Sequence, residues 1–310
     1  MSRRPLDNIL KPPRLHPGAR IGVIAPAGPV TGERLTRLDR GMDYLRRRGF
    51  RVIEGRFLRR RTGYTAGSDD ERLSDLNNML RDAQVDAVFC ARGGYGLGRL
   101  LDRIDYRAVR RRPKILVGYS DVTALQSALF RRTGLVTFAG PMVAADLGTP
   151  MPERTESSLW QMLTAAGEPP PVGELTTIAA GVAEGRLLGG CLSVLVTLLG
   201  TRFMPNLDGA VLVAEDIGEP LYKIDRYFCQ LKNAGFLRLL KGVILGQFTG
   251  MNDSSADLAA VVAGFFKGKV PIAAGLPFGH EPLKVTIPYG VRVRLDADVG
   301  TLHFLETGVL

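Results

Sequence analysis

The sequence predicts an α/β fold with an N-terminal parallel-sheet domain and a smaller, more β-rich C-terminal domain. Three observations support this prediction. Predicted strands and helices alternate along the first half of the chain. The strands are continuously apolar, as in parallel sheets that are covered on both faces. The chain has 310 residues, 45% of them apolar, which is more than a single hydrophobic core usually holds.

The first half contains five predicted strands, the first of them over 21–25. After a Pro/Gly turn, Leu35, Leu38, Met42 and Leu45 recur at the helical period, and Thr31 or Gly32 could cap this helix, which runs to Gly49. By the same criteria the other strands of this half cover 50–55, 85–96, 113–120 and 135–141, and its other helices cover 69–82, 99–109 and 121–132.

The composition of the sequence changes between 146 and 177, where proline- and glycine-rich stretches flank a short predicted helix around Trp160. We therefore predict an N-terminal domain over 1–150, a linker over 151–180 and a C-terminal domain over 181–310. The last of these opens with apolar stretches over 183–201 and 209–219, the second of them a strand that ends with Glu215 and Asp216. It continues with a strand over 242–248, strand-like stretches over 285–298 and 301–306, and helices over 220–235 and 258–266.

The net charge of +10 and the pI of about 9.8 make nucleic acid the first partner to consider. The basic residues are mostly arginines, and those at 46–48 are typical of the solvated C-terminal end of a helix. They are not interleaved with aromatic residues and do not follow a zinc-finger spacing. We therefore predict no nucleic-acid partner.

The spacing of the cysteines and the length of the apolar runs indicate the cellular compartment of the protein. Cys90, Cys191 and Cys229 are far apart and lack metal-ligand spacing, which predicts free thiols in a reducing compartment. Residues 1–18 carry charge and four prolines where a leader peptide needs an apolar core. The longest apolar run, 187–200, is too short to cross a bilayer. The prediction is a cytoplasmic protein with no membrane contact.

Ser120 lies between a predicted buried strand and a predicted helix. Ligands and chemistry collect at the carboxyl ends of strands in parallel sheets. A serine on such a tight turn projects out of the sheet and can act as a nucleophile. Here Gly118 keeps the first glycine of the G-x-S-x-G pattern, and the second is missing. The alternative is that Ser120 only caps the helix.

A serine nucleophile needs a base, and the chain has three histidines. His16 precedes the first strand, and His303 falls in an alternating strand where a packed imidazole is expected. His280 lies in a loop bounded by prolines and a glycine, and such loops often carry catalytic groups. We predict His280 as the base, with a loop histidine of no function as the alternative.

A histidine base is usually oriented by a carboxylate. Glu215 and Asp216 follow an apolar strand, where a carboxylate is costly unless it has a partner. Either residue could orient His280, and the spacing does not choose between them. The alternative is an acidic cluster that initiates the next helix.

The third predicted strand ends in a glycine cluster over 93–98. Its spacing fails the G-x-G-x-x-G pattern of dinucleotide-binding folds, and no Walker A lysine follows it. A glycine turn still brings backbone N–H groups close to a ligand. The N–H groups of Asp121 and of Gly93 or Gly94 are therefore candidate oxyanion donors.

Together these features resemble the LD-carboxypeptidase family, which comprises murein tetrapeptide carboxypeptidases and microcin-immunity hydrolases. The resemblance runs through nearly the whole chain. It rests on six stretches in register, which are IGVIAPAGPV, ARGGYGLGRLL, GYSDVTAL, GRLLGGCLSVLVTLLGT, VLVAEDIGEPLYKIDRYFCQLKNAG and GLPFGHEPLKVTIPYG.

The resemblance implies a Ser-Glu-His triad of Ser120, Glu215 and His280, and so selects Glu215 over Asp216. It implies a Rossmann-like nucleophile-elbow domain with Ser120 and a β-rich domain with the other two residues. It further implies a cytoplasmic serine carboxypeptidase of cell-wall recycling that releases terminal D-alanine from murein tetrapeptide at an L,D peptide bond. A homodimer without metal or cofactor is implied as well. Arg92, beside the glycine turn, is our candidate for binding the substrate carboxylate.

Two alternatives stay open. Microcin-immunity relatives hydrolyse peptidyl or aminoacyl nucleotides, and they tend to carry an insertion with stacking aromatic residues. This chain is compact, and its one tryptophan is Trp160. A non-catalytic α/β ligand-binding module is the second alternative, and the failed glycine pattern counts against it.

Overall fold

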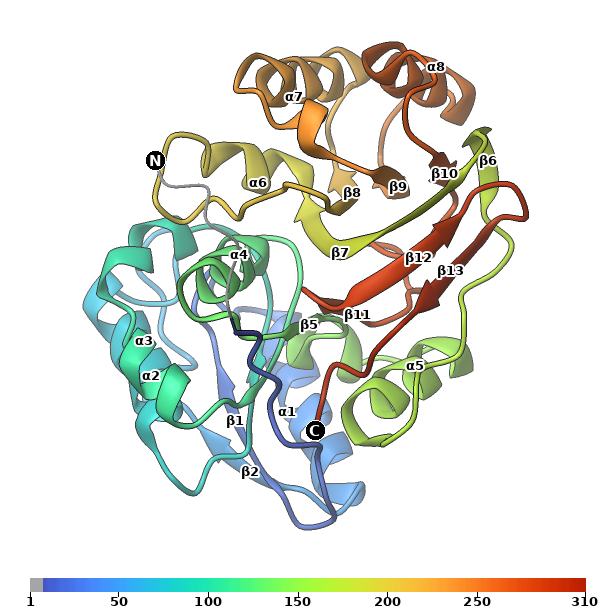
Figure 1. Ribbon diagram of the computed structural model, residues 1–310. Coiled ribbons are helices and arrows are strands. Elements are labelled where there is room, and N and C mark those ends of the chain that lie inside the picture. Colours follow the sequence, from blue (N-terminus) through green and yellow to red (C-terminus); the bar gives the residue numbers. More distant parts are fainter. Residues whose placement is uncertain (1–7) are drawn as a thin grey trace.

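The computed structural model describes residues 8–310 and contains two sheets, each covered by helices (Figure 1). The first seven residues of the predicted domain 1–150 lie outside the described part of the chain. The two-sheet α/β architecture confirms the predicted fold class. None of the helices in the described part combines the length and the apolar composition that crossing a bilayer requires.

The first sheet has six strands in the order β11-β5-β4-β3-β1-β2. Its strands are β1 (Arg20–Ile24), β2 (Arg51–Glu54), β3 (Ala87–Cys90), β4 (Ile115–Val117), β5 (Thr137–Ala139) and β11 (Ile287–Tyr289). The first five are parallel, as predicted, and β11 pairs antiparallel with β5. A strand from the predicted C-terminal domain thus completes the N-terminal sheet.

Helices cover both faces of the first sheet because its strands are apolar on both faces. Alternate residues of β3 join two different hydrophobic clusters, Phe89 on one face and Val88 on the other. The helices are α1 (Glu33–Arg47) and α5 (Glu153–Thr164) on the Phe89 face, and α2 (Asp69–Arg81), α3 (Tyr106–Arg111) and α4 (Val122–Thr133) on the Val88 face. This is the covered parallel sheet that continuous apolar strands predict.

The predicted helix over 99–109 is wrong in part. The structure has two short 3₁₀ turns, η1 (Leu97–Arg99) and η2 (Leu101–Arg103), and then α3. Ile104 is extended, and the side chain of Asp105 accepts a hydrogen bond from the backbone N–H of Ala108. This local bond starts a new helix instead of continuing the previous one.

The second sheet has seven strands in the order β13-β12-β7-β8-β9-β10-β6. Its strands are β6 (Thr176–Ala179), β7 (Val182–Cys191), β8 (Val211–Ile217), β9 (Gly242–Thr249), β10 (Ile272–Ala274), β12 (Arg292–Asp296) and β13 (Thr301–Phe304). The central strands β7 to β10 are parallel, and the edges are antiparallel. Helices α6 (Leu192–Thr197), α7 (Leu221–Asn233) and α8 (Ser255–Phe266) pack on one face.

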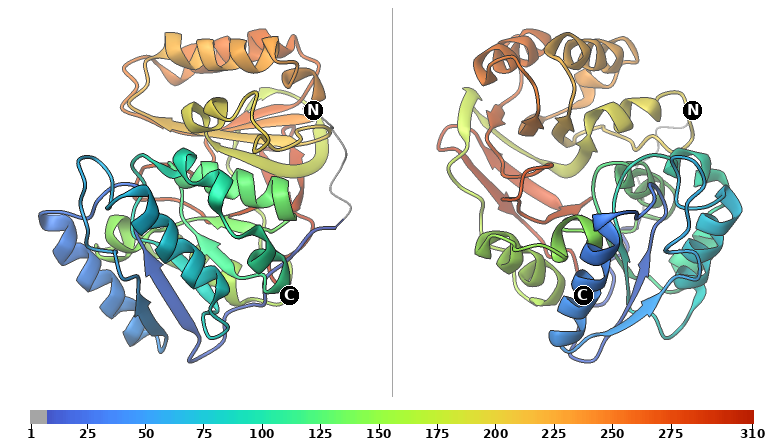
Figure 2. Two further views of the ribbon diagram at one scale, coloured as in Figure 1. Left: turned by 90° about the vertical axis from the view of Figure 1, so that its left-hand side faces the viewer. Right: turned by 180° about the vertical axis from the view of Figure 1, so that it is seen from behind.

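The two lobes share their hydrophobic cores. One cluster joins Leu125 of α4 to Leu212 of β8, and the other joins Phe138 of β5 to Val213 of β8. The predicted linker 151–180 is divided between the lobes, because α5 packs on the first sheet and β6 is an edge of the second. Figure 2 shows the lobes against each other from two further directions.

Candidate active site

Ser120 occupies the sharp turn that the sequence predicts between β4 and α4. Its φ is +66°, in the left-handed region that residues with a side chain rarely adopt. A side chain at Gly118 would begin 2.9 Å from Cγ2 of Val122, so this turn needs glycine there. The backbone strain is stored where the half-buried hydroxyl of Ser120 projects from the sheet.

Glu215 and His280 form a hydrogen-bonded pair although 65 residues separate them. Nδ1 of His280 lies 2.8 Å from Oε2 of Glu215. Glu215 lies in β8, and its side chain is fully buried. Burial raises the pKa of Glu215, and the hydrogen bond to His280 opposes this effect. Because Nδ1 is engaged, Nε2 is the ring nitrogen left to exchange a proton.

Asp216 points away from His280. Its Oδ2 accepts a hydrogen bond of 2.7 Å from the backbone N–H of Ser193, and its Oδ1 accepts one of 3.0 Å from the Ser193 hydroxyl. Consecutive residues of a strand face opposite sides, so only one of the two carboxylates can reach the imidazole. The geometry therefore pairs Glu215 with His280, and Asp216 anchors the start of α6.

The loop that carries His280 reaches the turn of Ser120 through Tyr119. The rings of Tyr119 and His280 meet edge to face, with centroids 5.2 Å apart. Gly279 has a φ of +145°, and a side chain there would begin 3.1 Å from Oε2 of Glu215. The glycine thus lets the imidazole approach the carboxylate. All three predicted catalytic residues lie at this junction between the lobes.

The glycine turn after β3 lies against Ser120. A side chain at Gly93 would begin 2.9 Å from Oγ of Ser120, whereas one at Gly94 would collide with Gly28. The carboxylate of Asp121 is buried and accepts a hydrogen bond of 2.9 Å from the backbone N–H of Leu97. This bond ties the glycine turn to the start of α4. Burial raises the pKa of Asp121 to about 6.

A buried network that the sequence analysis missed supports the site. Nζ of Lys284 lies 2.8 Å from Oδ1 of Asp146 and 3.0 Å from Oη of Tyr119, and it also lies over the Tyr119 ring. Lys284 is 2% exposed. No local pattern distinguishes this lysine from a solvated one, because its partners are more than 130 residues away.

Gln247 of β9 holds the histidine loop and was also missed. Its Nε2 donates a hydrogen bond of 2.7 Å to the carbonyl of Leu283, and its Oε1 accepts one of 3.0 Å from the backbone N–H of Glu281. The amide therefore holds two backbone positions that directly follow His280. The sequence signal that could have identified Gln247 is its position as a polar residue near the end of a buried strand.

Arg92 is half-buried beside the glycine turn. It donates a hydrogen bond of 3.0 Å to the carbonyl of Pro29. Within residues 8–310 no carboxylate forms an ion pair with it. Burial lowers the pKa of Arg92, and the nearby charge of Arg34 adds to this effect. Two guanidinium groups that repel each other favour the binding of an anion between them.

The remaining candidates lie elsewhere. His16 and His303 are exposed. The expectation that His303 is packed is wrong, because its side chain faces outward from the edge strand β13. Cys90 and Cys191 are buried free thiols, and Cys229 is exposed. The described residues include no cluster of three or more His, Cys, Asp or Glu side chains suited to a metal ion.

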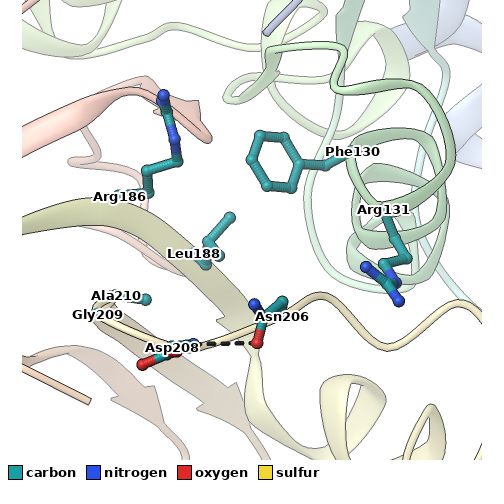
Figure 3. A pocket seen from close by; sticks show the side chains of 8 residues that line it. All are labelled: Phe130, Arg131, Arg186, Leu188, Asn206, Asp208, Gly209 and Ala210. Atoms are coloured by element: carbon teal, nitrogen blue, oxygen red, sulfur yellow. Dashed lines mark hydrogen bonds between the residues drawn. The ribbon is translucent and has the colours of Figure 1, made fainter. Parts of the chain in front are cut away.

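A small pocket of about 160 Å³ lies at the opposite end of α4 from Ser120 (Figure 3). Phe130 and Leu188 contribute apolar surface, and Arg186 and Asp208 contribute charge. A helix of this length spans about 18 Å. The pocket is therefore separate from the candidate active site.

The chain matches two family models. Residues 21–140 match the LD-carboxypeptidase N-terminal domain, and residues 184–295 match the LD-carboxypeptidase C-terminal domain. The probable murein peptide carboxypeptidase of Bacillus subtilis is 38% identical over 96% of this chain and 95% of its own length.

Two solved structures share the fold. The muramoyltetrapeptide carboxypeptidase from Oxalobacter formigenes superposes with a TM-score of 0.82 at 31% identity, over 92% of this chain and 97% of its own. The microcin C7 self-immunity protein MccF, known from Escherichia coli, superposes with a TM-score of 0.90 at 26% identity, over 97% and 100%.

Proposed function

The chain belongs to the LD-carboxypeptidase family, and from this premise we propose that it is a serine carboxypeptidase acting on murein tetrapeptide. The bond that it hydrolyses is the L,D peptide bond that holds the terminal D-alanine. The observation that carries the proposal is the 2.8 Å contact between Glu215 and His280, at a junction where the His280 ring meets Tyr119, the neighbour of Ser120.

In the proposed reaction, Oγ of Ser120 attacks the carbonyl carbon of the scissile bond while Nε2 of His280 takes the hydroxyl proton. Glu215 holds the imidazole and stabilises its positive charge. When the tetrahedral intermediate collapses, the C–N bond breaks and His280 gives the proton to the amine of the departing D-alanine. A water molecule then attacks the acyl-enzyme, with His280 again as the base.

The negative charge of the intermediate develops beside the glycine turn. The backbone N–H groups of Gly93 and Asp121 are the proposed donors. Gly93 is favoured over Gly94 because a Cβ added at Gly93 would lie 2.9 Å from Oγ of Ser120, whereas one at Gly94 would meet Gly28. One such donor is worth about 2.7–4 kcal/mol of transition-state stabilisation in other serine hydrolases. These groups cost no reorganisation during the reaction because they belong to rigid turns.

Arg92 is proposed to bind the free carboxylate of the terminal D-alanine. Its guanidinium lacks a carboxylate partner among the described residues, lies beside the glycine turn and faces the charge of Arg34. An anionic substrate would relieve this repulsion. Arg92→Ala is expected to raise KM or lower kcat/KM, and unchanged kinetics would remove Arg92 from the site.

The proposed setting is the cytoplasm, where the tetrapeptide arises from cell-wall turnover. We further propose a homodimer that needs neither metal nor cofactor. These points rest on the resemblance to the family. Chelator-treated protein is expected to keep its activity, and sedimentation is expected to give the mass of a dimer.

Mass spectrometry of a murein tetrapeptide incubated with the protein tests the function. The wild type is expected to release one alanine, and Ser120→Ala is not. Covalent labelling of Ser120 by a serine-directed probe separates a hydrolase from a ligand-binding module. If the wild type releases no alanine and takes no label, the proposal is wrong.

Hydrolysis of peptidyl nucleotides is the second candidate, because the superposition on the microcin C7 self-immunity protein covers 97% of this chain. Turnover of the tetrapeptide and of a peptidyl adenylate, measured side by side, decides between the two. We expect a higher kcat/KM for the tetrapeptide. The opposite order would favour the nucleotide substrate.

A further inference from the structure

We propose that Tyr119 is a positioning residue that fixes the His280 imidazole beside Ser120, and that Lys284 holds Tyr119 in place for this role. This inference rests on the proposed function and adds to it two residues outside the triad. Tyr119 directly precedes Ser120 in the turn between β4 and α4 and is 6% exposed. Its side chain is therefore part of the packed junction between the lobes and is not a surface group.

Two residues of one loop contact the side chain of Tyr119. The His280 ring meets the Tyr119 ring with their planes at 75°. Further along the loop, Nζ of Lys284 lies 4.2 Å from the centroid of the same ring and donates a hydrogen bond of 3.0 Å to its Oη. The hydroxyl in turn donates a bond of 3.3 Å to Oδ1 of Asp146. The ring of Tyr119 cannot turn away from the imidazole without breaking these contacts.

The imidazole of His280 is held from two directions. Oε2 of Glu215 engages Nδ1 at 2.8 Å, and this single hydrogen bond fixes one atom of the ring. The ring of Tyr119 supplies a second contact, and it comes from the turn that also carries Ser120. Because adjacent residues provide the nucleophile and this second contact, the imidazole is positioned relative to the hydroxyl that it deprotonates.

The loop itself is rigid, because every residue from 280 to 284 forms a hydrogen bond. Gln247 of the second sheet supplies two of these bonds. Oγ1 of Thr155 in α5 donates a bond of 3.1 Å to the carbonyl of Pro282 and accepts one of 3.0 Å from the backbone N–H of Lys284. Both lobes thus hold the loop, and its contacts with Tyr119 exist before any substrate binds.

Lys284 also places a positive charge near Glu215. Burial raises the pKa of Glu215, and the hydrogen bond to His280 and the charge of Lys284 lower it. The remaining titratable groups around the pair are Asp216, Asp146, Tyr119 and Cys191. The carboxylate holds the imidazole and stabilises its positive charge only when it is ionised. Lys284 therefore favours the form of Glu215 that the reaction needs.

NMR of protein with isotope-labelled histidine tests the positioning without a substrate. The proton between Nδ1 and the buried carboxylate is expected to exchange slowly with water and to give a separate signal. The exposed His16 and His303 are expected to give none. Tyr119→Leu removes the ring and is expected to make this exchange about tenfold faster, the size of one good aromatic contact. Tyr119→Phe keeps the ring and is expected to keep the slow exchange.

Tetrapeptide turnover separates positioning from binding. Tyr119→Leu is expected to lower kcat about 100-fold with KM unchanged, because a displaced base slows the chemistry and the buried ring does not touch the substrate. Tyr119→Phe is expected to stay within about fivefold of the wild type, the size of one hydrogen bond. Tyr106→Leu is the matched control, since Tyr106 is buried in α3 and its hydroxyl bonds the carbonyl of Leu101 at 2.7 Å. It is expected to leave kcat and the proton signal unchanged.

Lys284→Met tests the role of the charge and serves as the second variant if Tyr119→Leu does not fold. It is expected to speed the proton exchange, because it frees the Tyr119 ring. It should also move the acid limb of Ser120 labelling by a serine-directed probe to higher pH by about 0.5–1, because the pKa of Glu215 rises. Lys114→Met removes a buried lysine at the other end of β4 and is expected to leave the limb in place.

Three results would overturn the inference. Tyr119→Leu would contradict it by keeping the wild-type exchange rate, and Tyr106→Leu would do so by losing the signal to the same extent. An acid limb that does not move in Lys284→Met would remove the role of the charge. The NMR measurement needs no turnover, so it decides the positioning even if the wild type releases no alanine and the proposed function fails.

Discussion

Ser120 shows at the scale of one residue how catalysis and stability oppose each other. A positive φ costs a residue with a side chain about 1–2 kcal/mol, and glycine does not pay this cost. The φ of +66° therefore means that the hydroxyl is held in place at the expense of stability. The surrounding core supports the strain, because β4 and most of α4 are buried.

Replacing Ser120 should expose this strain. Ser120→Gly is expected to be more stable than Ser120→Ala by about 1 kcal/mol in urea unfolding. The matched control is Ser157 in the regular helix α5, where glycine should instead be less stable than alanine by about 0.5–1 kcal/mol. Equal stability of the two Ser120 variants would mean that the turn relaxes without the native side chain.

Asp121 illustrates a buried carboxylate that is costly to ionise. Its pKa is raised by burial to about 6, above the value of about 3.9 in unfolded chains. Between these values the native state keeps a proton that the unfolded chain has lost. The contribution of Asp121 to the free energy of unfolding therefore falls as the pH rises from about 4 to about 6.

The variant Asp121→Asn keeps an oxygen for the N–H of Leu97 and does not titrate. Its stability relative to the wild type is expected to increase by about 2–3 kcal/mol between pH 4 and pH 6.5. Because both proteins contain the same other titratable groups, the effects of those groups cancel in the difference between the two free energies of unfolding. Urea unfolding at several pH values measures it, and a constant difference would contradict the raised pKa.

At the scale of secondary-structure elements, close packing against α1 positions Asp146, which belongs to the site. The π-helical segment η3 (Val143–Leu147) carries Asp146, and it packs directly on α1. A side chain at Gly41 of α1 would begin 2.2 Å from the carbonyl oxygen of Val143. Gly41 therefore allows the backbones to approach, and this approach sets the position of Asp146.

Gly41→Ala is expected to lower the free energy of unfolding by about 2 kcal/mol and to reduce activity, because η3 must shift. Gly264→Ala in α8 is the matched control, since no atom lies within 4 Å of the added methyl group. It is expected to stabilise the protein by about 0.5–1 kcal/mol through the helix propensity of alanine. Thermal unfolding and tetrapeptide turnover of both variants check this contrast.

At the scale of the molecule, Lys284 anchors the segment that crosses from the second sheet to the first beside the site. Its ammonium group bonds Tyr119 of the elbow and Asp146 of η3, while its own segment continues from the His280 loop into β11. The segment that crosses from β10 of the second sheet to β11 of the first is thus anchored beside the elbow by one buried charge. A charge at this depth is tolerated only because it is paired and hydrogen-bonded.

Lys284→Met is expected to lower the free energy of unfolding by about 3 kcal/mol, because it leaves the carboxylate of Asp146 without its ion-pair partner. The double variant with Asp146→Asn should lose less than the sum of the two single variants. Urea unfolding of all four proteins measures this coupling. Strictly additive losses would show that Lys284 and Asp146 do not stabilise each other.

Much of the fold could be predicted from the sequence because its signals are local. Apolar runs and helical periodicity predicted the parallel strands and most helices, and Gly134 ends α4 in the left-handed conformation. The stretch 99–109 was predicted only in part, since one side-chain hydrogen bond at Asp105 interrupts it. The destination of β11 was not predictable, because pairing with β5 depends on contacts across the chain.

The sequence by itself determined the chemistry available to this protein: a serine on a tight turn, a loop histidine and two adjacent carboxylates. The spacing left both carboxylates open and the family resemblance pointed to Glu215, but only the tertiary structure brings Glu215 to the imidazole and adds Lys284, Asp146 and Gln247. The physical reason is the sequence separation over which the interactions act. Turns and periodicity depend on neighbouring residues, whereas these contacts join residues 36 to 138 positions apart and exist only once both sheets are packed.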